Sequence, residues 1–235
     1  MSLQAILQRY FTRELPADFQ PIIHLEVGTH DPTRDTSRFR VSDAGKCRLM
    51  RYWKRQGKPG QPYDGNPFVL EAGNLLHAYI QHAVIDQGLM IACEKPLEDE
   101  YRIGHFDMLI RDTERSRLGQ YATLYELKTV SAKQFYYKQR NAAPDRLHVF
   151  QIVSYAWMYL QEDQSHVDLT DLRIAYLNRD SLQLLEFLVD FQTYISAVTS
   201  DWGKLFDAWN SQQEPEPNAE SWECKCCQYA ATCYP

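Results

Sequence analysis

The sequence predicts an α/β protein in which a mixed central sheet is flanked by helices. Helical patterns come before and after a group of three strand-like segments, and two further strand-like segments come before a last helical segment. The chain has 235 residues, of which 44% are hydrophobic and 24% charged, so it can bury one sizeable core. No internal repeat is visible. We therefore expect one main domain with smaller attached segments.

The expected elements follow from local signals in chain order. Ser42 is suited to cap a helix over about residues 43–56, and apolar spacing predicts a longer helix over 67–86. Strands are expected where β-branched and aromatic residues cluster, and helices where apolar residues recur at helical spacing. The expected strands are 89–94, 101–110, 123–130, 172–177 and 182–189. Two further helices are expected over 147–160 and 191–209.

Breaker residues mark the connections between these elements. By composition the connections are a linker over 31–33, a loop over 57–62, a charged hairpin loop over 112–120 and a hairpin turn over 178–181. Residues 214–218, which include two prolines, separate the last helix from a cysteine-rich tail. The chain is thus expected to contain a helical segment over 1–66, a core over 67–213 and a tail over 214–235.

Nothing in the sequence indicates membrane insertion or secretion. There is no run of about 18 apolar residues, and the first residues lack the basic stretch and cleavage site of a secretory signal. We therefore expect a cytoplasmic protein with no membrane partner. In that reducing compartment, six cysteines are better explained as free thiols, metal ligands or catalytic groups than as disulfides.

The charge is unevenly distributed. A net charge of -6 argues against nucleic acid as a partner, because nucleic-acid binders usually display clustered Lys and Arg. Two local basic tracts nevertheless occur, and either one alone could be an ordinary solvated face. The first consists of Lys46, Arg48, Arg51, Lys54, Arg55 and Lys58, and the second of Lys128, Lys133, Lys138, Arg140 and Arg146.

Acidic and basic side chains fall on two strands that follow each other in the sequence. Asp107 lies on one predicted strand, and Glu126 and Lys128 lie on the next. Alternation along a strand points Glu126 and Lys128 to the same face. If the strands are neighbours, the two carboxylates offer hard oxygen ligands for Mg²⁺ or Mn²⁺, and Lys128 can activate water or offset charge on a phosphate.

The alternative is that Glu126 and Lys128 form a solvent-exposed charge pair. Their position inside an apolar run argues against it, because an unpaired charge there would be costly without a role. His77 on the preceding helix could complete a metal site, with His82 as a competing candidate. Gln151 and Tyr155 are four residues apart, so they project from one helical face, either to hold substrate or to pack in the core.

The order of these residues resembles the RecB-type branch of the PD-(D/E)xK nucleases, over the chain from Ser42 onward. Four spaced pairs carry this resemblance: Gly73 and His77, Gly104 and Asp107, Glu126 and Lys128, and Gln151 and Tyr155. It implies a restriction-endonuclease-like core. It also implies metal ligation by His77, Asp107, Glu126 and the backbone carbonyl of Leu127, catalysis by Asp107, Glu126 and Lys128, and substrate support by Gln151 and Tyr155. One departure is Phe106, which replaces the proline that names the superfamily.

Three cysteines at the end of the chain, Cys224, Cys227 and Cys233, need a fourth partner to bind a metal. Cys47 is the best donor, since Cys93 lies in a predicted strand and is expected in the core. Four thiolates can hold a 4Fe–4S cluster or a structural Zn²⁺. The one-plus-three pattern resembles the iron-sulfur nucleases of the RecB family, including the CRISPR-associated exonucleases. The resemblance therefore implies iron, with Cys226 as a spectator.

These observations predict a metal-dependent exonuclease that acts on DNA ends, preferably single-stranded. No phosphate-binding loop of the motor type is present, so the chain has no helicase activity of its own. The resemblance implies a role in CRISPR spacer acquisition together with integrase proteins. Two alternatives stay open: a phage or chromosomal recombination or repair exonuclease, and a DNA-binding protein that does not cut and carries a zinc or iron-sulfur staple.

Two further segments are expected near the DNA. Rings interleaved with cations over 133–140 suit stacking on unpaired bases, although a helix that packs these rings inward is an equal alternative. The cluster on Cys47 is expected to bring Lys46, Arg48 and Arg51 near the path of the DNA.

Overall fold

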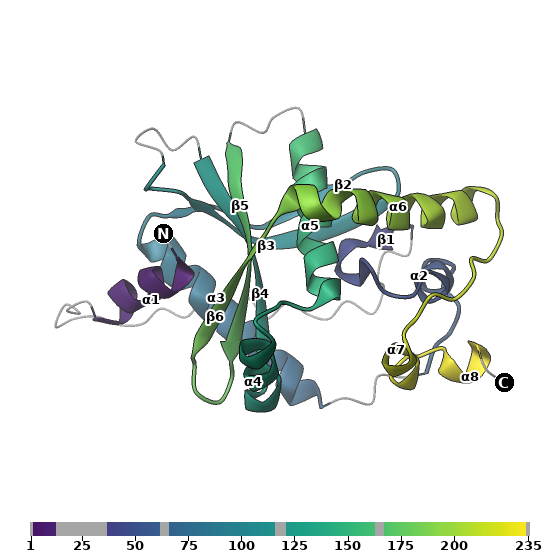
Figure 1. Cartoon of the computed structure of the whole chain (residues 1–235), viewed down its shortest axis with the longest axis horizontal. Helices are drawn as coiled ribbons and strands as arrows, with labels where there is room; N and C mark the ends of the chain where they lie inside the picture. The colour runs from purple at the N-terminus through teal and green to yellow at the C-terminus, as the bar shows by residue number, and fades with distance from the viewer. Residues whose placement is uncertain (1, 13–36, 62–65, 116–120, 163–166, 234–235) are drawn as a thin grey trace.

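The computed structural model describes residues 2–12, 37–61, 66–115, 121–162 and 167–233. Its described strands form one mixed sheet in the order β1-β3-β4-β5-β6, with β2 also paired to β3 (Figure 1). The β1–β3 and β4–β5 pairs are parallel and the other pairs are antiparallel, which confirms the predicted mixed sheet. The strands are β1 (Phe39–Arg40), β2 (Met90–Glu98), β3 (Arg102–Arg111), β4 (Tyr121–Val130), β5 (Asp168–Asn178) and β6 (Leu184–Val189).

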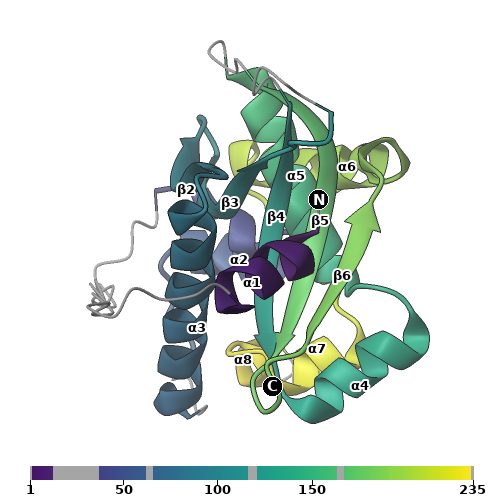
Figure 2. The same ribbon diagram turned by 90° about the vertical axis from the view of Figure 1, so that its left-hand side faces the viewer.

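Helices cover both faces of this sheet. In Figure 2, α1 and α3 lie over the nearer face, and α5 and α6 lie behind it. Alternate residues of the central strands therefore enter two separate cores, so that Met108 joins the α1–α3 side and Leu109 the α5–α6 side. The helices are α1 (Leu3–Thr12), α2 (Arg48–Arg55), α3 (Pro67–Asp86), α4 (Ala132–Asn141), α5 (Arg146–Gln161), α6 (Phe191–Asn210), α7 (Ser221–Lys225) and α8 (Ala230–Cys233).

The first predicted helix begins later than expected, because Ser42 does not cap it. Residues Val41–Asp43 form a 3-10 turn, and the chain bends at Gly45, where φ is +73°. A Cβ atom at Gly45 would lie 2.9 Å from the ring of Phe150, so this bend brings the backbone against α5. Helix α2 starts only at Arg48, whose N–H donates to the Asn218 side chain at 2.7 Å. The cap thus comes from the other end of the chain.

Several elements were not expected as separate elements from the sequence, namely helices α1, α4, α7 and α8 and the short strand β1, and the expected elements differ only at their ends. Helix α4 begins after Ser131, whose hydroxyl accepts from the Gln134 N–H while the Gln134 side chain accepts from the Ser131 N–H. This capping box is a visible signal that we did not use. The turn after Asn178 is confirmed, but β6 starts at Leu184 because Leu182 has a φ of +58°.

The C-terminal helices of the described chain pack against the segment around α2. Helices α7 and α8 lie beside α2, at the end of the molecule opposite α1 (Figure 1). The Gln61 N–H donates to the Gln228 carbonyl at 2.8 Å, and the Tyr229 hydroxyl donates to the Lys58 carbonyl at 3.0 Å. Within the described part of the chain, no helix combines the length and the apolar character that a bilayer span requires. The predicted linker over 31–33 and residues 116–120 of the predicted loop lie outside the described residues.

Candidate functional site

The predicted acidic residues meet where β3 and β4 part. The antiparallel ladder pairs Met108 with Tyr125, and Asp107 and Glu126 face each other one position further along. The backbone ladder between β3 and β4 does not continue at this position, and the Leu127 N–H donates to Asp107 Oδ2 at 2.6 Å. The expectation that these two strands are neighbours is confirmed, and their separation leaves room for the carboxylates.

Glu126 is a buried acid with few partners. Its side chain is 1% exposed, and Lys128 Nζ lies 2.6 Å from its Oε1 atom. Apart from this ion pair, neither oxygen of Glu126 has a hydrogen-bond partner within the described chain. An anionic oxygen that is buried without a donor is costly, and a bound cation would offset that cost.

The electrostatics of the site follow from this burial. Burial raises the pKa of both Asp107 and Glu126 to about 7, with repulsion from Glu94 adding to the shift of Asp107 and repulsion from Asp107 adding to that of Glu126. Burial and the charge of Lys128 lower the pKa of His77 to about 4. Burial also acts to lower the pKa of Lys128, but Glu126 and Asp107 outweigh it and raise the value. At neutral pH, His77 is therefore a neutral imidazole and Lys128 a cation.

A third acid, Glu94 on β2, belongs to this group and was not singled out in the sequence. Ligand atoms of His77, Glu94 and Asp107 lie within 4.8 Å of one another. His82 is exposed and lies outside this group. Glu94 belongs to none of the four spaced pairs, and its left-handed backbone, with φ of +47°, cannot be foreseen from a glutamate in a strand-like segment.

The two residues predicted to support the substrate lie on α5, which contacts β3. Gln151 and Tyr155 are both buried in α5, and the Tyr155 hydroxyl is hydrogen-bonded by the Gln151 side chain and the His105 backbone. Burial and the nearby charges of Glu126 and Asp107 raise the pKa of Tyr155. These contacts place Tyr155 against the strand segment that carries Asp107. Leu127 has its side chain in the α1–α3 core and its backbone beside Asp107.

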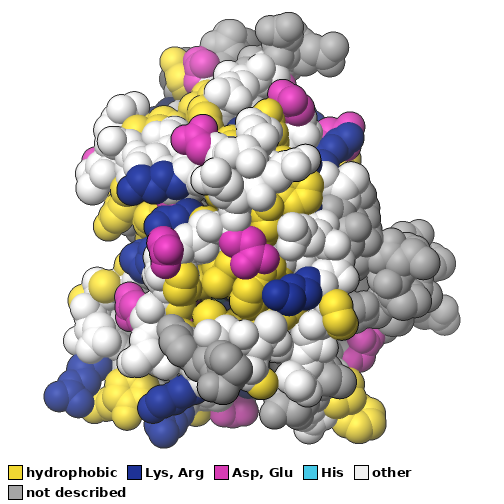
Figure 3. All heavy atoms as spheres, turned by 90° about the vertical axis from the view of Figure 1, so that its right-hand side faces the viewer, with side chains coloured by type: hydrophobic (Ala, Val, Ile, Leu, Met, Phe, Trp, Pro, Cys, Tyr) yellow, Lys and Arg dark blue, Asp and Glu magenta, His cyan; other side chains and the backbone are white. Residues whose placement is uncertain are grey.

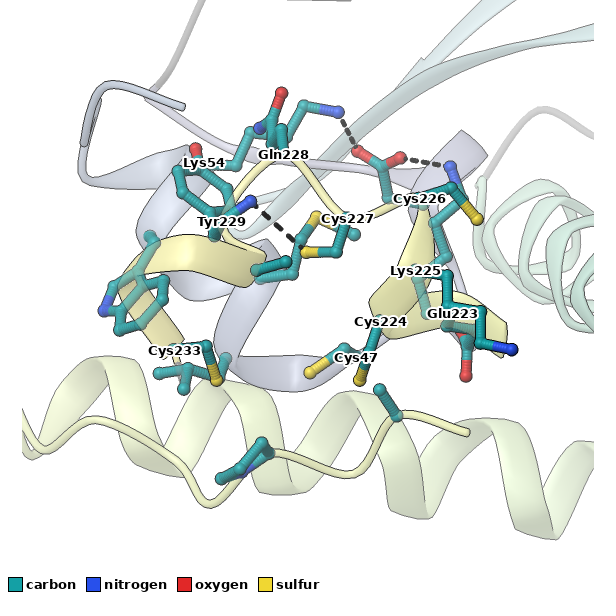
Figure 4. A pocket seen from close by; sticks show the side chains of 18 of the residues that line it. Cys47, Lys54, Glu223, Cys224, Lys225, Cys226, Cys227, Gln228, Tyr229 and Cys233 are labelled. Atoms are coloured by element: carbon teal, nitrogen blue, oxygen red, sulfur yellow. Dashed lines mark hydrogen bonds and ion pairs between the residues drawn. The ribbon is translucent and has the colours of Figure 1, made fainter. Parts of the chain in front are cut away.

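A second candidate site is a cavity of about 400 Å³ between α2, α7 and α8. Five cysteines line it, and Figure 4 shows Cys47 and Cys224 side by side, with Cys227 and Cys233 further round the cavity. Burial, followed by repulsion from the neighbouring thiols, raises the pKa of Cys227 and Cys233. Cys226 is exposed, and its Sγ donates to the Trp222 carbonyl at 3.2 Å. None of the six cysteines forms a disulfide.

The described sulfur atoms do not form a tight group of three or more. No three of the six described cysteines place their Sγ atoms within 4.8 Å of one another. Four thiolates around one tetrahedral zinc would lie only about 3.8 Å apart, given Zn–S bonds of about 2.3 Å. Cys93, expected in the core, is half-buried on β2 next to Glu94 and does not line this cavity.

The first basic tract makes ion pairs within the molecule, and the expectation that Lys46, Arg48 and Arg51 lie near the path of the DNA stays a prediction. Its charges are used inside the molecule: Arg51, with a side chain 1% exposed, and Arg48 pair with Asp201, and Lys46 pairs with Asp43. The outer face of this region shows Lys and Arg side chains interspersed with Asp and Glu rather than a continuous basic patch (Figure 3). The other pairings in the tract join Lys54 to Asp43, Arg55 to the Trp209 ring and Lys58 to the Trp53 ring.

The aromatic segment of α4 is divided between the core and the surface. Phe135 is buried, as the inward-packing alternative required, while Tyr136 and Tyr137 are 57% and 46% exposed. Lys133 and Arg140 are exposed as well, and Lys138 pairs with Asp145. Only part of the segment is therefore available to a ligand.

Comparison with known proteins gives a fold but no family. No family model and no curated protein matches the chain. Among solved structures, an alkaline exonuclease from Laribacter hongkongensis matches with a TM-score of 0.51 and 10% identity, over 76% of this chain and 90% of that one. The same exonuclease in complex with dAMP matches over the same shares, with a TM-score of 0.48 and 13% identity. A candidate exonuclease from Eubacterium rectale matches over 94% of this chain and 93% of that one, with a TM-score of 0.48 and 12% identity. The first match shows that this chain shares its mixed α/β fold with the alkaline exonuclease.

Proposed function

We propose that this chain is a metal-dependent deoxyribonuclease that hydrolyses phosphodiester bonds from DNA ends, preferably of single strands. The observation that carries the proposal is the buried carboxylate pair Asp107 and Glu126, with Lys128 beside it, at the point where two strands separate. Its fold is shared with an alkaline exonuclease, which is consistent with this chemistry. Carboxylates that can bind a divalent cation, with a lysine beside them, can promote phosphodiester hydrolysis.

The donor set suits a hard divalent cation. His77, Asp107, Glu126 and the backbone carbonyl of Leu127 would hold Mg²⁺ or Mn²⁺, for which oxygen ligands are preferred. The Glu126 oxygen that lacks a hydrogen-bond donor fits this role. When bound, the ion would supply Lewis acidity and a more acidic water.

The chain's own residues account for the rest of the chemistry. Lys128 keeps its proton because Glu126 and Asp107 raise its pKa, so its Nζ can orient the attacking water and offset charge on the phosphate. Gln151 and Tyr155 support substrate binding indirectly, because their buried side chains fix the part of β3 that carries Asp107.

Cys47, Cys224, Cys227 and Cys233 are proposed to hold one 4Fe–4S cluster. Two observations support this: the four residues line a single cavity, and no three of the described cysteines bring their sulfurs within 4.8 Å of one another, as a single zinc ion would require. The cluster would fasten the tail to α2. A place in CRISPR spacer acquisition, with integrase proteins as partners, is a further proposal that rests on the resemblance of the cysteine pattern.

End-labelled oligonucleotides test the proposed activity. Single-stranded and duplex DNA, labelled at either end, is incubated with the purified chain in Mg²⁺, Mn²⁺ or EDTA. We expect stepwise shortening that requires the metal and is faster on single strands. Tight DNA binding without any cleavage in either metal would instead support a DNA-binding protein, and cuts inside circular DNA would exclude an exonuclease.

A further inference from the structure

Three carboxylates lie in a row across three strands. On β2 and β3, Cys93 pairs with Met108 and Lys95 with Phe106, so Glu94 stands opposite Asp107. Asp107 in turn faces Glu126 on β4. Glu94 is the member of the row closest to solvent, since it is exposed while Asp107 and Glu126 are buried.

The backbone and a neighbouring glutamine fix the direction of the Glu94 side chain. Its φ of +47° is a left-handed conformation, which is strained for a residue with a Cβ atom. Gln81 Nε2 donates to Glu94 Oε1 at 2.6 Å and to the Asp107 carbonyl at 3.4 Å. Gln81 follows His77 by one helical turn on α3, so both side chains project from the same face of the helix. This face therefore supplies the His77 imidazole and a hydrogen bond to Glu94.

The second oxygen of Glu94 is available to a ligand. Among the described residues, Oε2 has no hydrogen-bond or ion-pair partner, and ligand atoms of His77, Glu94 and Asp107 come within 4.8 Å of one another. A second, independent feature points to a cation: the side chain of Glu126 is 1% exposed, and its Oε2 atom has no partner in the part of the chain that the structure describes. Three carboxylates against the single lysine leave the group with an excess of negative charge.

We propose that Glu94 is a further ligand of the divalent cation and binds it together with His77 and Asp107. The imidazole and the two carboxylates form a mixed nitrogen and oxygen set that suits Mn²⁺. Gln81 acts as a positioning residue, because it holds one oxygen of Glu94 and leaves the other for the metal. This inference rests on the proposed nuclease function, but metal binding can be measured without DNA.

The test compares Mn²⁺ binding by calorimetry, in the full chain without DNA, for the wild type, Glu94→Gln, Glu94→Gly and Glu100→Gln. Glu94→Gln keeps the shape of the side chain and should weaken Mn²⁺ binding at least tenfold. Glu94→Gly relieves the left-handed strain, so its melting temperature should equal or exceed that of the wild type while Mn²⁺ binding falls equally. Glu100→Gln changes an exposed glutamate next to β2 and should alter neither quantity.

Each result decides between a ligand and a structural residue. If Glu94→Gln binds Mn²⁺ as tightly as the wild type, or if the wild type binds no Mn²⁺, the proposed ligand is wrong. If Glu94→Gly loses melting temperature and metal binding together, Glu94 acts only through stability. A wild type that binds Mn²⁺ through Glu94 but leaves all DNA intact would overturn the nuclease function and support the metal site.

Discussion

The Tyr155 side chain lies so close to Gly104 that no other residue fits at that position without a shift. A Cβ atom at Gly104 would lie 2.8 Å from Cε1 and 2.9 Å from the hydroxyl of Tyr155. The glycine of the Gly104 and Asp107 pair is therefore explained by the ring that packs against it. Because Tyr155 also contacts the His105 backbone, this packing positions the strand that leads to Asp107.

Gly104→Ala should displace Tyr155, reduce DNA cleavage and cost about 1–3 kcal/mol of unfolding free energy through overpacking. Chemical denaturation and the oligonucleotide assay measure the two effects. Gly203→Ala is the matched control, because a Cβ atom there meets nothing within 4 Å inside α6. That control should raise stability by about 0.5–1 kcal/mol, as expected for Gly to Ala in a helix. Equal stability of both variants would contradict the close contact.

Glu126→Gln and Lys128→Ala should each lower the cleavage rate by more than about 100-fold, because one changes a metal ligand and the other removes the charge beside the phosphate. Both variants should keep the circular dichroism of the wild type. Lys204→Ala, an exposed lysine on α6, is the control and should cleave normally. Cleavage within twofold of wild type by either site variant would remove these residues from the mechanism.

The metal-free protein should become less stable with rising pH because of Glu126. A carboxyl whose pKa is raised by folding binds its proton more tightly in the folded state, so stability falls between the unfolded pKa of about 4.5 and the folded value of about 7. His77, with its pKa lowered to about 4, acts oppositely over about pH 4–6.5. The comparison with Glu126→Gln isolates the contribution of this acid. In EDTA, the unfolding free energy of the variant should rise relative to that of the wild type from pH 5 to pH 8. A constant difference in unfolding free energy across this range would contradict the raised pKa.

Protein purified without oxygen should be brown and contain about four irons per chain. Cys47→Ser should lose the colour and much of the thermal stability, because this cysteine is the only ligand from the front of the chain. Cys226→Ser should keep both the colour and the thermal stability, since the exposed Cys226 sulfur is hydrogen-bonded to the Trp222 carbonyl. Colourless protein with one zinc per chain would replace the cluster with a zinc site, and a coloured Cys47→Ser variant would exclude Cys47 as a ligand.

Tyr136 and Tyr137 should contribute to single-stranded DNA binding, while Phe135 should contribute to stability. Replacing either tyrosine by alanine should weaken binding by about 1–3 kcal/mol if a base stacks on it, and should affect duplex binding less. Phe135→Ala removes a buried ring and should cost about 3–5 kcal/mol of unfolding free energy. Tyr194 is an exposed tyrosine on α6, so Tyr194→Ala controls for a nonspecific loss of DNA binding. Equal losses on single strands and duplexes would exclude stacking on unpaired bases.

Local patterns predicted most elements and brought together several residues of the candidate site. Period-two and helical spacing located β3, β4 and α3, because burial of one or both faces leaves a direct trace in the residue types. Glu94 was missed because its role depends on a left-handed φ and on Gln81, neither of which has a sequence signature. The ion pairs of Arg48 and Arg51 with Asp201 were not predicted, because this partner lies about 150 positions away in the sequence.

The cap that Asn218 supplies to α2 sets an order of events during synthesis. The N–H of Arg48 finds its acceptor 170 positions later in the chain. On the ribosome, the front of the protein is therefore made long before the residue that completes it. Until Asn218 emerges, Cys47 belongs to a nascent chain whose other candidate ligands do not yet exist. Delivery of iron and sulfur to this site would thus have to follow the synthesis of Cys233.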